Sequence, residues 1–248
     1  MPPIPPAPSG YWQNAFDLEA HLGSFLGLGA ADLREKLRAG QQQLAELGWR
    51  DFDWDRADAF YRDQVGSAYL LDLAAWHLSS TDYIGDTLRL VADHARGLVL
   101  DFGGGIGTHA IGAALCGAVE RVIFWDINPV HRQLVRLRAE KLGLKDQIHC
   151  PETFPEGIQL DTILCFDVIE HLPDPAEQLR QFYSWLQPEG KLLINWYFFK
   201  GFNGEFPFHL DDPQRIEEFF RVLQSHFLEI FHPYFITARC YRKWKTDS

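Results

Sequence analysis

The sequence is poor in methionine, cysteine and positive charge. It holds one methionine and four cysteines in 248 residues, and 23 basic residues face 34 acidic ones, which gives a formal net charge of -11. A chain of this charge repels nucleic acid and anionic membranes. Its one basic cluster, Arg242–Lys245, is interpreted as an edge strand and a solvated tail. We therefore expect no nucleic-acid partner.

The few cysteines do not form a recognisable metal or disulfide pattern. Cys116, Cys150, Cys165 and Cys240 form no CxxC pair, and each lies in an apolar or strand-like run. Such cysteines are typical of buried free thiols in a reducing compartment. We expect no metal site and no disulfide.

Long hydrophobic runs are also missing. No uninterrupted apolar segment approaches the roughly 20 residues that span a bilayer. The first residues, MPPIPPAPSG, lack the basic and apolar regions of a signal peptide. Residues 1–10 are predicted to be a mobile, proline-rich leader. We expect a cytoplasmic protein without a membrane span.

Residues 11–96 are predicted to form a helical cap. Asp32 is predicted to be an N-cap, with Glu35 at capping-box spacing. The following apolar residues share one helical face: Leu33, Leu37, Leu44 and Leu47. A second periodic run ends near Ala95, and Gly97 follows where a helix end favours positive φ. We interpret the many aromatic residues of this segment mainly as core, with a pocket wall as the alternative.

From residue 97 the pattern changes to alternating strands and helices. The expected strands LVLDF, RVIFWDI, QIHC, DTILCFD and KLLINWYFF are apolar on both faces, and helices are predicted over 129–142 and 175–186. This pattern indicates a parallel sheet covered on both sides. A helix over 214–227 then leads to FLEIF and FITARCYRKW, which we predict to be antiparallel neighbours. Residues 97–248 therefore form the predicted α/β domain.

A glycine-rich turn follows the first expected strand. After Asp101 and Phe102, glycines occupy positions 103, 104, 105 and 107. Glycine there permits positive φ and close approach of a ligand to the backbone, and the following helix start favours an anion. The spacing departs from GxGxxG, because Thr108 stands at the third glycine position, and no GK[ST] follows. Asp101 would repel a pyrophosphate and attract an ammonium, so the turn favours an amino-acid group.

A second acidic residue follows the next strand. Asp126 lies about 25 residues after Asp101, in FWDINP. A carboxylate there accepts hydrogen bonds from two ribose hydroxyls. Trp125 and Ile127 are expected beside an adenine. An amino-acid end, a ribose and a purine together describe S-adenosylmethionine.

These motifs resemble the class I S-adenosylmethionine-dependent methyltransferases. LDFGGGIG matches their glycine motif, WDINP their acidic ribose motif, and LDTILCFDVIEHLPDP and LQPEGKLLI their fourth- and fifth-strand motifs. The resemblance covers residues 98–248 and implies a Rossmann-like, seven-stranded mixed sheet of order 3-2-1-4-5-7-6, with strand 7 antiparallel. Three features depart from the family: HCPETF lacks the usual acid after strand three, Leu160 stands where the family has a phenylalanine before the strand-four acid, and the N-terminal 95 residues match no cap that we can name.

The resemblance implies S-adenosylmethionine as cofactor and suggests the residues that bind it. The predicted cofactor-binding residues are Asp101, Gly103, Gly104, Gly105, Gly107, Asp126, Ile127, Phe166 and Asp167. Methyl transfer to oxygen or carbon also needs a base, and the candidates are His171, His209 and Asp167, with the histidines favoured because imidazole titrates near neutrality. The simpler interpretations are that Asp167 caps a turn, that Glu170 is solvated, and that His171 positions rather than deprotonates.

Three functions fit these features. The first is a methyltransferase for a small aromatic or apolar acceptor, with 198–212 and the cap as the substrate wall, because long loops at this sheet edge tend to be functional. The second is a methyltransferase that acts on a protein or peptide side chain. The third is a catalytically inactive module that binds S-adenosylmethionine. A homodimer is left open.

Overall fold

The computed structural model describes residues 15–51, 53–64, 66–233 and 237–244. Its centre is a seven-stranded sheet in the order β3-β2-β1-β4-β5-β7-β6. The strands are β1 Gly97–Phe102, β2 Val119–Trp125, β3 Ile148–His149, β4 Leu160–Cys165, β5 Leu186–Ile194, β6 Phe227–Ile230 and β7 Arg239–Lys243. Strands β1 to β5 pair in parallel, and β7 is antiparallel to both β5 and β6. The predicted fold class and strand order are confirmed.

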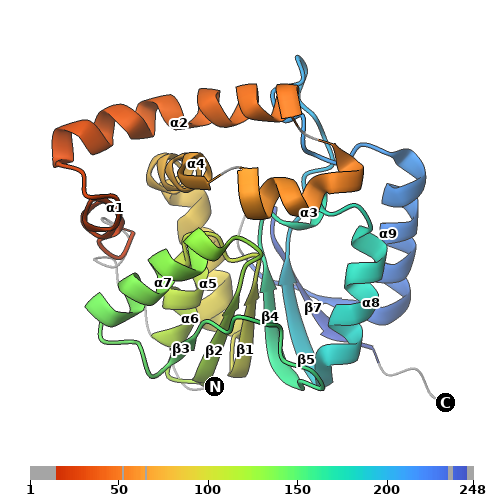
Figure 1. The fold of residues 1–248 in the computed structure, drawn as a ribbon. Helices are drawn as coiled ribbons and strands as arrows, with labels where there is room; N and C mark the ends of the chain where they lie inside the picture. The colour runs from red at the N-terminus through yellow and green to blue at the C-terminus, as the bar shows by residue number, and fades with distance from the viewer. Residues whose placement is uncertain (1–14, 52, 65, 234–236, 245–248) are drawn as a thin grey trace.

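Helices cover both faces of the sheet (Figure 1). Helices α5 Thr81–His94, α6 Thr108–Ala114 and α7 Pro129–Lys141 lie on one face, and α8 Pro175–Trp185 and α9 Pro213–His226 lie on the other. Successive strand residues alternate between the faces: Val99 packs with the first set of helices and Leu100 with the second. Two apolar cores therefore enclose the parallel strands, as their continuous apolar sequence predicts.

The N-terminal helices extend over the carboxyl ends of the strands (Figure 1). They comprise α1 Leu18–Leu26, α2 Ala30–Asp51, a short 3-10 helix at Trp54–Arg56, α3 Ala57–Ala59, a π-helical turn at Phe60–Gln64 and α4 Gly66–Ser79. Leu22, Leu33 and Leu70 form a third core with Leu134 of α7. The cap is thus packed on the α/β part, above the edge where a ligand would bind.

The elements differ in detail from those predicted. Helix α2 begins at Ala30, so Asp32 lies in its first turn and the predicted N-cap there is wrong. Gly97 has the expected positive φ, 58°, although it already belongs to β1. Strand β5 ends at Ile194, so the aromatic residues 196–199 follow the strand instead of extending it. The leader 1–10 lies outside the described residues, and the boundary at residue 96 stays a prediction.

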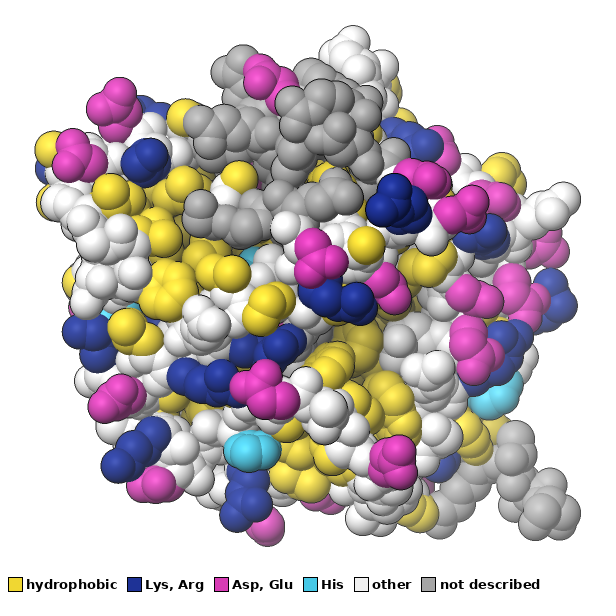
Figure 2. Space-filling view, viewed as in Figure 1, with side chains coloured by type: hydrophobic (Ala, Val, Ile, Leu, Met, Phe, Trp, Pro, Cys, Tyr) yellow, Lys and Arg dark blue, Asp and Glu magenta, His cyan; other side chains and the backbone are white. Residues whose placement is uncertain are grey.

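The structure shows where the cysteines and the charged side chains lie. Cys150, Cys165 and Cys240 are buried, Cys116 is half-buried, and all four are free thiols. Basic and acidic side chains are interspersed on the face shown in Figure 2. Among the described residues, none of the helices combines the length and the apolar character that crossing a membrane requires.

Candidate functional site

The glycine turn lies at the carboxyl end of β1 and has no room for side chains. Gly105 has a φ of 54°, and a Cβ atom there would lie 2.9 Å from Leu73 Cδ1 of α4. A Cβ atom on Gly104 would lie 2.4 Å from Asp101 Oδ2. Bare backbone is therefore required between β1 and α6, which allows a ligand to approach the main chain closely.

Asp101 is a buried carboxylate with an unsatisfied oxygen. The residue is 2% exposed, and its Oδ2 atom has no hydrogen-bond partner. Burial raises its pKa to about 7; the backbone N–H of Ala110 opposes this rise, and the nearby charge of Asp126 adds to it. A buried carboxylate with an unpartnered oxygen is costly, and an ammonium group of a ligand would stabilise it.

Asp126 connects the end of β2 to the glycine turn. Its Oδ2 accepts a hydrogen bond from the Gly105 N–H at 2.9 Å, and its Oδ1 accepts one from the Asn128 N–H at 2.8 Å. His131 Nδ1 lies 3.1 Å from Oδ2. Each carboxylate oxygen has a second lone pair, so Asp126 can hold the turn and still accept ribose hydroxyls.

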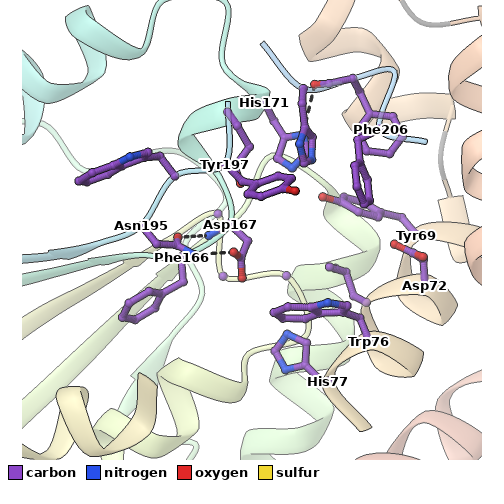
Figure 3. Close-up of a pocket in the computed structure, with 18 of the residues that line it drawn as sticks. Tyr69, Asp72, Trp76, His77, Phe166, Asp167, His171, Asn195, Tyr197 and Phe206 are labelled. Atoms are coloured by element: carbon purple, nitrogen blue, oxygen red, sulfur yellow. Dashed lines mark hydrogen bonds between the residues drawn. The ribbon is translucent and has the colours of Figure 1, made fainter. Parts of the chain in front are cut away.

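A cavity of about 740 Å³ opens beside these groups. Figure 3 shows Tyr69, Asp72, Trp76 and His77 of α4 on one side and Phe166, Asp167 and Asn195 on the other. His171, Tyr197 and Phe206 lie at one end. The glycine turn, Asp101 and Asp126 also line it. The cavity is large enough for a cofactor tail and a small acceptor.

Asp167 is held by Asn195 and Tyr83. Asn195 Nδ2 donates to Asp167 Oδ1 at 2.5 Å, and Asn195 Oδ1 accepts the Asp167 backbone N–H at 2.6 Å (Figure 3). Tyr83 Oη donates to the same carboxylate at 3.2 Å. Burial raises the pKa of Asp167, while these two partners lower it. Asp167 also has a φ of 55°, so the turn after β4 is constrained.

The two candidate histidines meet at one end of the cavity. The ring centroids of His171 and His209 are 4.7 Å apart. Leu210 N–H donates to Glu170 O at 2.7 Å, which ties the loop after β5 to the turn after β4. Burial lowers the pKa of His209 to about 4 and that of His171 well below its usual range. Both rings are therefore neutral at neutral pH.

Glu170 does not have the solvated position expected for it. It is 1% exposed and lines the cavity next to the two histidines. Burial raises the pKa of its carboxyl to about 8, with a further contribution from the nearby charge of Asp167. Glu170 follows a buried strand end, and the loop 198–212 covers it, which no local pattern indicates.

Most predicted cofactor-binding residues line the cavity, but two do not. Phe166 lines it beside His109, with ring centroids 4.5 Å apart. Ile127 and Gly107 are not among its lining residues. A Cβ atom on Gly107 would lie 2.6 Å from Val135 Cγ2, so the lack of a side chain there serves the packing of α6 against α7.

The cap supplies lining residues that sequence reasoning did not identify. Tyr69, Asp72, Trp76 and His77 come from α4, and Tyr83 comes from α5. The aromatic residues of this segment could have indicated a pocket wall, but from the sequence we interpret them mainly as core. Asn195 directly follows β5, and its pairing with Asp167 depends on the neighbouring positions of β4 and β5 in the sheet.

These groups fit S-adenosylmethionine. The unpartnered Asp101 oxygen suits an ammonium, the side-chain-free turn suits a ligand pressed against backbone, and Asp126 retains lone pairs for a ribose. The cavity lining between them is mostly apolar and aromatic, as expected for a small-molecule site.

Comparison with known proteins points the same way. The methyltransferase-domain family matches residues 75–220. The chain is 29% identical over 122 residues to a ubiquinone biosynthesis O-methyltransferase of Marinobacter nauticus, covering 46% of this chain and 48% of that protein. It is 36% identical over 100 residues to a ribosomal protein L11 methyltransferase of Photobacterium profundum, covering 39% and 32%. The chain thus spans about half the length, or less, of these two curated relatives.

Solved structures share the fold. An O-methyltransferase family protein from Burkholderia thailandensis has a TM-score of 0.57 at 16% identity, covering 83% of this chain and 70% of that one. Mitomycin 7-O-methyltransferase has a TM-score of 0.55 at 15% identity, covering 93% and 71%. Because the family matches more than half of the sequence, the chain belongs to the class I S-adenosylmethionine-dependent methyltransferase domains, and S-adenosylmethionine is the methyl donor that this domain implies.

Proposed function

We propose that this protein transfers a methyl group from S-adenosylmethionine to a small aromatic or apolar acceptor. The observation that carries the proposal is the cavity of about 740 Å³, which joins the glycine turn to a lining of aromatic side chains from α4 and from the loop after β5. The cap helix α4 limits access to this cavity, and an apolar, partly enclosed space favours a small acceptor over a folded protein.

The residues of the chain perform binding, orientation and exclusion of water. When bound, S-adenosylmethionine supplies a methyl group already activated by its sulfonium. Asp101 and the glycine turn hold the amino-acid end, and Asp126 holds the ribose. Phe166 and Trp76 present aromatic faces in the cavity, where a positive charge is favoured. An acceptor atom placed in line about 3 Å from the methyl group then needs little further help.

We propose that His171 or His209 takes the proton that the acceptor hydroxyl loses on methylation. Both are neutral at neutral pH because burial lowers their pKa values, so each can accept a hydrogen bond from an acceptor hydroxyl. Asp167 is already engaged by Asn195 and Tyr83, and we propose that it positions the turn after β4 instead of taking the proton. This assignment ranks the histidines above Asp167 as bases.

Replacement of Asp126 by alanine is expected to weaken cofactor binding. Asp126→Ala removes the ribose acceptor and also the hydrogen bond that holds the Gly105 N–H. The expected loss is on the order of 1–3 kcal/mol of binding free energy. Isothermal titration calorimetry with S-adenosylhomocysteine measures it, and an unchanged affinity would exclude the ribose role.

Cofactor affinity is expected to fall as the pH is lowered through 7. The pKa of Asp101 is raised to about 7, so its carboxyl is mostly protonated at pH 6 and cannot pair with an ammonium. From the ionised fraction, the affinity for S-adenosylhomocysteine should drop roughly eightfold between pH 7.5 and pH 6. Asp101→Asn should bind more weakly and lose this pH dependence. If the variant kept the wild-type slope, another group would be responsible.

A screen of acceptors with S-adenosylmethionine labelled in its methyl group tests the proposal. The candidate small acceptors are phenols, catechols and apolar hydroxyl compounds. Ribosomal protein L11 is tested in parallel as a protein acceptor, because one of the relatives is a ribosomal protein L11 methyltransferase. Label transferred to a small compound, and lost in His171→Ala or Asp126→Ala, supports the proposal. Label found only in protein would instead favour a side-chain methyltransferase. Tight cofactor binding without any transfer would favour an inactive module.

A further inference from the structure

Three potential metal ligands converge at the acceptor end of the cavity. One ligand atom each from Glu170, His171 and His209 lies within 4.8 Å of the others. Glu170 and His171 belong to the short 3-10 helix after β4, Ile169–His171, and His209 lies in the loop before α9. All three line the cavity.

The Glu170 carboxylate has an oxygen without a partner. Its Oε2 atom is buried and makes no hydrogen bond, and the residue is 1% exposed. No lysine or arginine is found among the described residues that line the cavity, whereas Asp167 and Asp101 add further negative charge to it. A buried carboxylate in this setting needs either a proton or a cation.

The hydrogen bonds of the two histidines indicate which ring nitrogens can bind a metal. His209 Nδ1 lies 3.0 Å from Phe199 O, and His171 Nδ1 lies 3.4 Å from Phe208 O and 3.0 Å from Tyr61 Oη. A carbonyl oxygen only accepts, so the contact with Phe199 O favours a proton on Nδ1 of His209 and leaves its Nε2 lone pair for a ligand. His171 Nδ1 donates to Phe208 O or accepts from the Tyr61 hydroxyl, depending on the tautomer. Metal-bound histidines commonly donate their other N–H to a backbone carbonyl in this way.

We propose that Glu170, His171 and His209 bind a divalent transition metal of the zinc or iron(II) type. Two imidazoles and one carboxylate suit these metals better than Mg²⁺ or Ca²⁺, which prefer oxygen ligands alone. Three protein ligands leave coordination positions open, the pattern of catalytic and not of structural sites. No sequence motif predicts this metal site, because the cysteines have no ligand spacing and Glu170 and His209 are 39 positions apart.

The open side of the site faces the cavity. That this cavity holds the acceptor rests on the proposed function. The site would then favour acceptors with a hydroxyl or phenolic oxygen. A metal at this position uses one ring-nitrogen lone pair of each histidine, so the same nitrogens cannot also serve as free bases while it is bound. Metal binding and free-base action are thus alternatives that one experiment can separate.

Titration of untagged, chelator-treated protein with Co²⁺ and Zn²⁺ tests the metal site directly. Wild-type protein should bind one equivalent with a micromolar or lower dissociation constant, and Co²⁺ should give visible d–d absorption. Glu170→Gln and His209→Ala should each weaken binding roughly 100-fold or more. His149→Ala, which removes an exposed histidine on β3, should bind as wild type does.

The same samples separate failure of the metal site from failure of the proposed function. S-adenosylhomocysteine affinity, measured by calorimetry, reports the cofactor site, and circular dichroism reports folding. Wild-type protein that binds S-adenosylhomocysteine but no equivalent of Co²⁺ or Zn²⁺ would overturn the metal proposal, and Glu170 would then be a protonated carboxyl. Folded variants that bind metal as tightly as wild type would overturn it equally. Metal binding without any cofactor affinity would contradict the proposed function only.

Discussion

Gly105→Val is expected to lower the affinity for S-adenosylhomocysteine by at least roughly 100-fold, or about 2.7 kcal/mol of binding free energy. Gly105 lines the cavity, and even a Cβ atom there would lie 2.9 Å from Leu73 Cδ1. Valine adds two further methyl groups at a φ of 54°, a conformation that β-branched residues rarely adopt. The side chain would fill the space that the ligand needs, and the strained turn would displace the N–H that Asp126 binds.

A matched glycine controls for loss of folding in this experiment. Gly117→Val places the same side chain where a Cβ atom meets nothing within 4 Å and where φ is not positive. This variant should bind S-adenosylhomocysteine as wild type does in calorimetry, while circular dichroism confirms that both variants are folded. A folded Gly105→Val protein with wild-type affinity would show that the ligand does not approach this turn.

The cofactor half of the site was predictable because it is built from short, continuous segments. Asp101 and the glycines lie within seven residues at the end of the strand, and their spacing together with the charge of Asp101 favours an amino-acid group over a pyrophosphate. Asp126 stands at the end of the neighbouring parallel strand, and such ends meet at one edge of the sheet. The strand order itself came from the resemblance, since apolar strand sequences do not specify their neighbours.

The acceptor half could not be predicted to the same extent because distant segments build it. Glu170 contacts the loop 198–212, whose Leu210 N–H donates to its carbonyl oxygen, and this loop is distant from it in the sequence. Trp76 and Tyr83 point into the cavity from helices whose aromatic pattern fits a core equally well. Predicting these contacts requires the position of the cap on the sheet, which no motif in residues 11–96 indicates.

The buried residue Arg138 shows how the cap and the glycine turn depend on each other. It lies on α7, is 0% exposed, and donates from Nη1 to Ile106 O at 2.5 Å and from Nη2 to Ala15 O at 2.7 Å. Ile106 belongs to the glycine turn and Ala15 precedes α1. Burial lowers the pKa of Arg138 to about 9, so the guanidinium is still charged at neutral pH and its hydrogen bonds are of the strong, charge-assisted kind.

Arg138→Ala is therefore expected to lower the free energy of unfolding by roughly 3–5 kcal/mol. The substitution leaves buried carbonyl oxygens without donors and opens a cavity between α7, the glycine turn and the start of the cap. Urea unfolding followed by circular dichroism measures the loss. S-adenosylhomocysteine affinity should fall as well, because Ile106 is no longer held.

Two further variants show which part of the effect comes from the hydrogen bonds. Arg138→Met keeps most of the volume but no donors, and it should recover only the part of the stability that depends on packing. Arg136→Ala removes an arginine two positions away whose side chain is 43% exposed and pairs with the exposed Glu152 and with Cys150 O, and it should cost less than about 1 kcal/mol. Equal losses in Arg136→Ala and Arg138→Ala would mean that the contact of α7 with the glycine turn and the cap contributes no more than a surface ion pair.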